Sequence, residues 1–246
     1  MISKHLLAAV LLWSSALPVF SQAPPGTRTE IRLLAFSPDL EMDEIFAQDP
    51  AAPPATASVK SAIKGGLNHE FNVFQLMGRK IVFTKKADRE SMTREGELVA
   101  EVTLPEGVKS AILLAIPPSK DSKALCRILV INDSKRAFPP GSYHVTNLSP
   151  LKVRMILEDK NYDFNPSQTV LIEKPPFRPD HSIGMRTFAF KDNTWLQMAA
   201  SIWSEPGLRR GVLILYPDVA SGNVQLRAFD DVLPRAEKED AAAAAP

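Results

Sequence analysis

Hydrophobic and polar residues alternate along most of this chain in short segments that are separated by proline-rich or glycine-containing turns. In residues 97–104, for example, Leu98, Val102 and Leu104 alternate with Glu and Thr. Alternation with a period of two, in segments rich in β-branched and aromatic residues, predicts half-buried strands. We expect strands at residues 29–36, 70–77, 80–84, 97–104, 110–116, 125–131, 142–148, 152–158, 169–173, 183–190, 195–203, 211–216 and 224–229.

The same patterns predict where strands are deeply buried and where other structure replaces them. Residues 110–116 and 125–131 are nearly all apolar, which predicts burial on both faces. The best helical candidates are residues 39–48 and 56–63, which we expect to form a loop with a turn or two of helix. Asp, Asn, Ser and Gly residues at 191–194 and 218–223 predict hairpin turns.

Proline is frequent, with 21 residues in the chain. It cannot donate a hydrogen bond to a sheet ladder, so Pro-Pro pairs should lie between strands. The pairs are at residues 24–25, 53–54, 117–118, 139–140 and 175–176.

This pattern indicates an all-β protein with more strands than one immunoglobulin-like sandwich contains. Because the polar and proline-rich residues 135–140 form a natural break, we predict two tandem β-sandwich domains of immunoglobulin-like or Greek-key type. They span residues 28–136 and 137–235, and a single larger sandwich or barrel is the alternative. No convincing sequence repeat relates the halves. Residues 22–27 are predicted to be a linker, and residues 236–246 a disordered tail.

The N-terminus indicates where the protein acts. Lys4 precedes the apolar residues 6–13, and small residues follow, as in a secretory signal peptide. The apolar run is shorter than the roughly 20 residues of a spanning helix, and Pro18 interrupts its end. We predict a signal peptide at residues 1–21, cleaved after Ser21, and a periplasmic or secreted protein without a membrane span. A retained membrane anchor is the alternative.

Composition and net charge limit the kinds of partner that the chain can bind. Hydrophobic residues make up 45% of the chain and charged residues 23%, and the formal charge of +1 falls to zero when the leader with Lys4 is removed. A neutral chain has no general electrostatic reason to bind nucleic acid. Cys126 is the single cysteine, so no internal disulfide forms, and we expect a buried, small apolar residue there.

Patterns that suggest metal binding are incomplete. Residues 159–165 read D-x-N-x-D-x-N, the spacing of oxygen ligands in an EF-hand loop. Phe164 replaces the glycine that the loop requires, so a strand or hairpin is the better interpretation. A copper site would need Cys126 and two histidines close together, but Cys126 and His144 are separated by two expected strands. We predict no metal and no cofactor.

Candidate catalytic groups are also weak. Asp180, His181 and Ser182 are neighbours in sequence, whereas the members of a triad come from separate segments. Asp230 and Asp231 would point to opposite faces of a strand, which does not suit a pair of acids acting on one bond. We therefore predict that the chain is not an enzyme. A hydrolase with a cleft between the two halves is kept as an alternative.

Trp195 and Trp203 are the candidate ligand-binding residues. They are eight positions apart, so they share a face if the strand is regular. An exposed aromatic row can stack on sugar rings, although filling a sandwich core is the commoner use of such residues. A carbohydrate-binding module is therefore an alternative function. Arg209 and Arg210 are candidates for a cation–π contact with Trp203 or for a small anion site.

One part of the chain resembles a known class of proteins. The stretch Phe138-Pro-Pro-Gly-Ser-Tyr-His-Val-Thr-Asn-Leu-Ser149, with Trp195 and Arg209-Arg-Gly-Val-Leu-Ile-Leu-Tyr216 later, resembles exported bacterial β-sandwich proteins without an assigned function. The resemblance covers mainly residues 125–232 and implies a β fold and export, with no catalytic residues. We therefore predict an exported, non-catalytic binding or structural module of the cell envelope, with an envelope protein or glycan as partner.

Overall fold

The computed structural model describes residues 26–67, 71–218 and 221–232. Sixteen strands in these residues form four sheets of four strands each, and the short helical turns η1 (Pro38–Leu40) and η2 (Arg89–Met92) accompany them. The predicted all-β fold class is confirmed. The expected leader, most of the expected linker and the expected tail lie outside the described residues.

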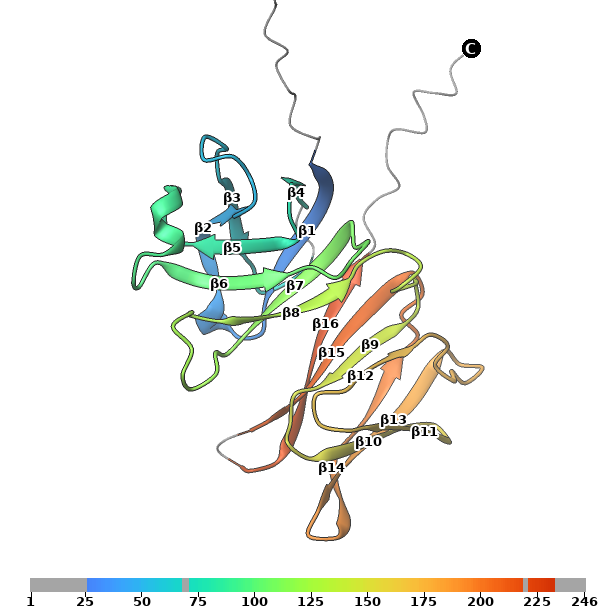
Figure 1. Cartoon of the computed structure of the whole chain (residues 1–246). Coiled ribbons are helices and arrows are strands. Elements are labelled where there is room, and N and C mark those ends of the chain that lie inside the picture. Colours follow the sequence, from blue (N-terminus) through green and yellow to red (C-terminus); the bar gives the residue numbers. More distant parts are fainter. Residues whose placement is uncertain (1–25, 68–70, 219–220, 233–246) are drawn as a thin grey trace, which may run out of the picture.

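The first eight strands form one sandwich, which we call the N-terminal sandwich (Figure 1). One sheet has the order β4-β1-β7-β8 and the other β3-β2-β5-β6, and a separate apolar core fills the space between them. The strands are β1 (Thr27–Ala35), β2 (Met42–Gln48), β3 (Val59–Ile63), β4 (Asn72–Leu76), β5 (Lys80–Thr84), β6 (Leu98–Thr103), β7 (Ser110–Ile116) and β8 (Arg127–Asn132).

The last eight strands form the C-terminal sandwich, which has its own core. Its sheets have the orders β12-β9-β15-β16 and β11-β10-β13-β14. The strands are β9 (Tyr143–Asn147), β10 (Lys152–Leu157), β11 (Lys160–Phe164), β12 (Thr169–Ile172), β13 (Ser182–Lys191), β14 (Thr194–Ser204), β15 (Arg209–Pro217) and β16 (Val224–Val232).

Most expected strands are present. The expectation of a loop with a turn or two of helix is met only by η1, which ends at Leu40, and is wrong for the rest of the two ranges. Residues 39–48 and 56–63 contain strands β2 and β3, which pair with each other, while β2 also pairs with β5. Ile45 and Ile63 are buried in the core, so sheet pairing decides the conformation where local propensity is weak. The hairpin expected at residues 191–194 is confirmed, and Asp192 and Asn193 both have positive φ, as its tight turn requires.

The two sandwiches share one topology. In each, the first strand pairs antiparallel with the fourth and parallel with the seventh, and the seventh pairs with the eighth. Both also carry a bulge at the same place in the second sheet: Val99 is the extra residue of β6, and Met198 is the extra residue of β14. The chain is therefore a structural repeat, although its sequence showed no convincing one.

The sandwiches pack through the outer faces of corresponding sheets, the sheet of β1 and β7 against the sheet of β15 and β16 (Figure 1). This contact explains why β7 is buried on both faces, because one face covers the N-terminal core and the other meets the second sandwich. An apolar cluster fills the contact, and its members include Leu34, Phe36, Ile112, Leu114, Ile131, Phe138, Val212, Ile214 and Phe229.

Four charged side chains are buried beside this apolar cluster, and we call them the ion cluster: Arg32, Asp133, Arg210 and Asp231. Arg32 donates from Nη1 to Asp231 Oδ1 at 2.6 Å and from Nη2 to Asp133 Oδ2 at 2.8 Å. Arg210 donates from Nε to Asp231 Oδ2 at 2.9 Å, and its Nη2 bonds to both carboxylates. Two positive and two negative charges therefore balance across the contact.

Backbone carbonyls accept further hydrogen bonds from the two arginines, while the buried Nε of Arg32 has no partner among the described residues. Arg32 Nη1 donates to the carbonyl of Leu67 at 2.7 Å, and Arg210 Nη1 donates to that of Phe138 at 2.8 Å. Burial by itself raises the pKa of Asp231, but the contacts with Arg32 and Arg210 outweigh it and hold this pKa below its usual value. Burial likewise lowers the pKa of Arg32, whereas its carboxylate partners raise it overall, so both groups stay charged.

Removing one member of the ion cluster should destabilise the whole chain. We expect Arg210→Met to lower the free energy of unfolding by about 3–5 kcal/mol, because it leaves two buried carboxylates with a single cation, Arg32, between them. Arg209→Met is the matched control, since Arg209 is exposed and 4.0 Å from the exposed Asp230, and it should cost only about 0–1 kcal/mol. Urea unfolding measures both, and equal effects would contradict a special role for the cluster.

Candidate functional site

The two candidate tryptophans lie on opposite faces of their sheet. Trp195 pairs with Phe190, and Trp203 pairs with Ile183, whose positions on β13 differ by an odd number of residues. The bulge at Met198 causes this change, because one extra residue reverses which face the later positions occupy. A regular strand would have placed both indoles on one face, so they do not form a single aromatic row.

Trp195 lies on the outer face of the sheet, where it is half-buried. Its ring lies 5.2 Å from that of Phe190, and the guanidinium of Arg154 stacks 4.6 Å from its centroid. Asp163 accepts two hydrogen bonds from Arg154 and so fixes the guanidinium over the indole. The result is a rigid aromatic and cationic patch on the surface.

Trp203 faces the interior of the sandwich and packs edge-on against Tyr143, with 5.4 Å between the ring centroids. Tyr143 in turn lies across Gly211 of β15, where a Cβ atom would be only 2.5 Å from Tyr143 Cδ1. A glycine is therefore required at residue 211 for the tyrosine ring to cover the strand. These residues form one wall of a pocket.

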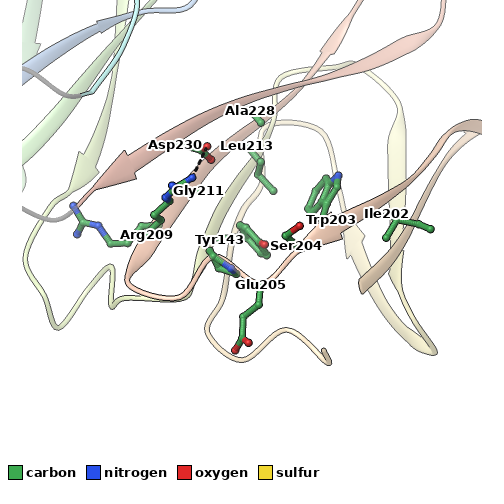
Figure 2. A pocket seen from close by; sticks show the side chains of 12 residues that line it. Tyr143, Ile202, Trp203, Ser204, Glu205, Arg209, Gly211, Leu213, Ala228 and Asp230 are labelled. Atoms are coloured by element: carbon green, nitrogen blue, oxygen red, sulfur yellow. Dashed lines mark ion pairs between the residues drawn. The ribbon is translucent and has the colours of Figure 1, made fainter. Parts of the chain in front are cut away.

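This pocket has a volume of about 620 Å³ and lies between β14 on one side and β15 and β16 on the other (Figure 2). A second pocket of about 630 Å³ follows along the same edge and shares Trp203 and Ala228 with the first. We call the two pockets together the edge groove. Its lining includes Tyr143, Met185, Met198, Trp203, Leu213, Leu226 and Ala228.

The strand that borders the edge groove is unusual for an outer strand. β14 has 11 residues without one charged residue or proline, whereas the outer strands β6, β8, β11 and β16 all carry charges. The uncharged outer strands β4 and β12 have only five and four residues. Ile202 on β14 is 72% exposed. Long apolar edges invite pairing with other chains, so natural proteins usually protect them. The absence of charge is visible in the sequence, but the groove is not.

The other candidate groups are engaged elsewhere. Ser182 Oγ donates to Asp180 Oδ1 at 2.7 Å, while His181 Nδ1 lies 2.5 Å from Glu205 Oε2, so these neighbours do not form a triad. Arg210 belongs to the ion cluster and stacks on Phe138 at 4.3 Å from the ring centroid, which excludes the expected contact with Trp203. The cleft expected between the two halves in the hydrolase hypothesis is absent from the described residues, because packed apolar side chains fill the contact between the sandwiches.

The groups considered for copper lie in different sandwiches. Cys126 is buried in the N-terminal core, where burial raises its pKa to about 11, and it bonds to the carbonyl of Val99. His144 belongs to β9 and packs edge-on against Phe138. Within the described ranges, no group of three or more His, Cys, Asp or Glu side chains is placed to hold a metal ion.

Comparisons with known proteins do not assign a family. No family model matches the chain, and no curated protein matches it. One similar solved structure is that of a "putative cell adhesion protein" from Bacteroides uniformis ATCC 8492, with 9% sequence identity and a TM-score of 0.21, covering 85% of this chain and 99% of that chain. Similarity at this level carries no argument about function. No helix among the described residues is long and apolar enough to cross a membrane.

His144 gives a prediction about pH. Burial lowers its pKa from 6.5 to about 4, and no described group bonds to its buried Nδ1 atom. In the unfolded chain the His144 imidazole becomes protonated near pH 6.5, whereas in the folded chain it becomes protonated only near pH 4. The free energy of unfolding therefore falls as the pH decreases between these values. We expect a loss of about 2 kcal/mol from pH 7 to pH 5 in urea unfolding.

Substitution of the histidine tests the assignment. His144→Gln should remove most of this pH dependence, because the titrating group is gone. A His144→Gln protein that still loses about 2 kcal/mol between pH 7 and pH 5 would assign the effect to other groups.

Proposed function

We propose that this chain is an exported, non-catalytic binding protein of the cell envelope, and that the edge groove of the C-terminal sandwich is its contact surface. The leader-like residues 1–21 support export. The partner is an envelope protein that places apolar side chains in the groove.

The observation that carries this proposal is the combination of β14 with the apolar groove beside it. An uncharged outer strand such as β14 promotes aggregation when it is exposed. Such a strand is tolerated where a binding partner covers it. Trp203 and Tyr143 provide aromatic anchor surfaces of the kind enriched at binding hot spots. The ion cluster and the apolar contact between the sandwiches hold this edge on a rigid support.

A substitution in the middle of the groove tests the proposal. Ala228 is exposed and lines both pockets, so Ala228→Lys should fill the groove with a charge at little cost in stability. We expect the variant to lose at least about 90% of the envelope protein that crosslinks to the unmodified chain, as for a hot-spot substitution above 1.4 kcal/mol.

The matched control is Ala55→Lys, which places the same charge on an exposed loop of the N-terminal sandwich. It should crosslink as the unmodified chain does. Equal recovery of the partner by both variants would place the contact surface elsewhere.

A second candidate function is carbohydrate binding on the outer face at Trp195. The observation that favours it is the patch of Trp195, Phe190 and Arg154, in which a half-exposed indole is held at the surface. Indole faces stack on sugar rings, and the guanidinium donates to hydroxyl groups. Trp203 faces the interior, so it would not contribute to the same sugar site.

Glycan arrays test this second candidate. Trp195→Ala should reduce binding of any retained glycan at least about tenfold, because stacking on one aromatic ring is worth roughly 1–3 kcal/mol. Trp203→Phe, on the opposite face, should leave it unchanged. Glycan binding that survives Trp195→Ala, or an unmodified chain that binds no glycan, would end the carbohydrate hypothesis.

A further inference from the structure

The N-terminal sandwich shows how this fold closes the edge that the C-terminal sandwich leaves open. Val99, the bulged residue of β6, is fully buried. The backbone N–H of Cys126 donates to the carbonyl of Val99 at 3.1 Å, and its Sγ lies 3.6 Å from the same oxygen. The segment of turns and bends that precedes β8 and ends at Cys126 thus covers the bulge and places a small apolar side chain in the core.

The corresponding bulge of the C-terminal sandwich lacks such a cover. Met198 is the extra residue of β14, and it is half-buried and lines the edge groove. In the N-terminal sandwich the cover comes from the connection between β7 and β8, residues 117–126. The equivalent connection between β15 and β16 spans only residues 218–223. Among the described residues, no backbone N–H outside the sheet bonds to the carbonyl of Met198.

The backbone of β14 is oriented to accept another segment. The N–H of Glu205, just after β14, donates to the carbonyl of His181 just before β13, at 2.7 Å. Along an antiparallel ladder alternate residues face the partner strand, so Ala199, Ser201 and Trp203 bond toward β13. The N–H and carbonyl groups of Ala200 and Ile202 therefore point to the open edge, where the groove begins.

We infer that the occupant of the edge groove is an extended polypeptide segment of a partner protein, which adds along β14 and contacts its bulge as Cys126 contacts the bulge of β6. This inference rests on the proposed function. The incoming segment donates a backbone N–H to the carbonyl of Met198 and places a small apolar side chain between the sheets. Met185 and Met198 in the lining can adapt to side chains of different shape.

A second copy of this chain fits the edge less well. Pairing of two β14 strands requires two regular edges, and the bulge at Met198 interrupts the ladder in the middle of each. A single segment from another protein meets only one bulge, that of β14. The covered bulge of β6 in the N-terminal sandwich shows that this fold can bind a segment at such a bulge. The partner is therefore a strand from another protein, with alternating apolar residues.

The test uses a synthetic peptide of residues 121–130, with alanine in place of Cys126, as the probe. We expect it to bind the exported chain and change the fluorescence of Trp203, which lies in the groove. Ala200→Pro removes one N–H that points to the open edge, and should weaken binding at least about tenfold, as for one lost hydrogen bond in a desolvated site. Ala200→Ser keeps the N–H and should bind as the unmodified chain does.

A modified peptide keeps the test valid if Ala200→Pro fails to fold. N-methylation at the amide of position 126 removes the donor that would reach Met198, and should abolish binding. N-methylation at position 125 alters an amide that points away from the edge, and should be tolerated.

Peptide binding that is absent, or insensitive to Ala200→Pro and to N-methylation at position 126, overturns the inference. A dimer in sedimentation that Ala200→Pro dissociates overturns it in favour of a second copy. Ala228→Lys separates the two proposals. If this variant loses its crosslinked envelope protein while the peptide fails to bind or a dimer forms, the proposed function stands and only the inference of an extended partner segment is wrong.

Discussion

The face-to-face contact between the two sandwiches, with its buried ion cluster, is the constraint on which the rest of the structure depends. Two arginines and two aspartates, from β1, β15, β16 and the residue that follows β8, neutralise one another where water is excluded. Such a cluster adds little net stability compared with apolar packing, but it is costly to misalign, because any shift leaves a buried charge without its partner. It therefore specifies one arrangement of two domains that share a topology. The edge groove is placed on that rigid body.

The repeat explains both the similarity and the difference between the halves. Strand order, parallel pairing and the position of the bulge are the same. Each sandwich therefore has a bulged outer strand with an open edge, β6 in one and β14 in the other. The N-terminal half covers the bulge of β6 within the chain, through the segment that ends at Cys126. The C-terminal half has a shorter connection and an uncharged edge strand, and it keeps a groove. A difference of a few residues in one loop thus separates a closed structural domain from a domain with a free binding edge.

The chemistry of the groove is that of recognition. Its walls include aromatic and apolar side chains, and polar side chains such as Glu205, Asp230 and Gln225 line it as well. The backbone of the open strand β14 can read the shape and direction of an extended chain. Of the titratable groups that the sequence offered, Asp230 lines the groove, whereas His144 lies at the contact between the sandwiches and Cys126 in the other core. The outer face at Trp195 is a separate surface, held by Arg154 and Phe190, and the two surfaces can be tested independently.

Short-range alternation and turn chemistry are enough to predict the β class, most of the strands, the hairpin at Asp192 and Asn193, and the burial of Cys126. The sequence by itself did not determine β2 and β3, whose local sequence is ambiguous and which form strands by pairing with each other and, for β2, with β5. The repeat was also hidden, since it preserves topology and a bulge but not side chains. One extra residue at Met198 separated Trp195 from Trp203, and a count of positions along a strand does not reveal a bulge. The ion cluster joins Arg32 to Asp231 across most of the chain, so only the tertiary structure decided that contact and the groove whose edge it supports.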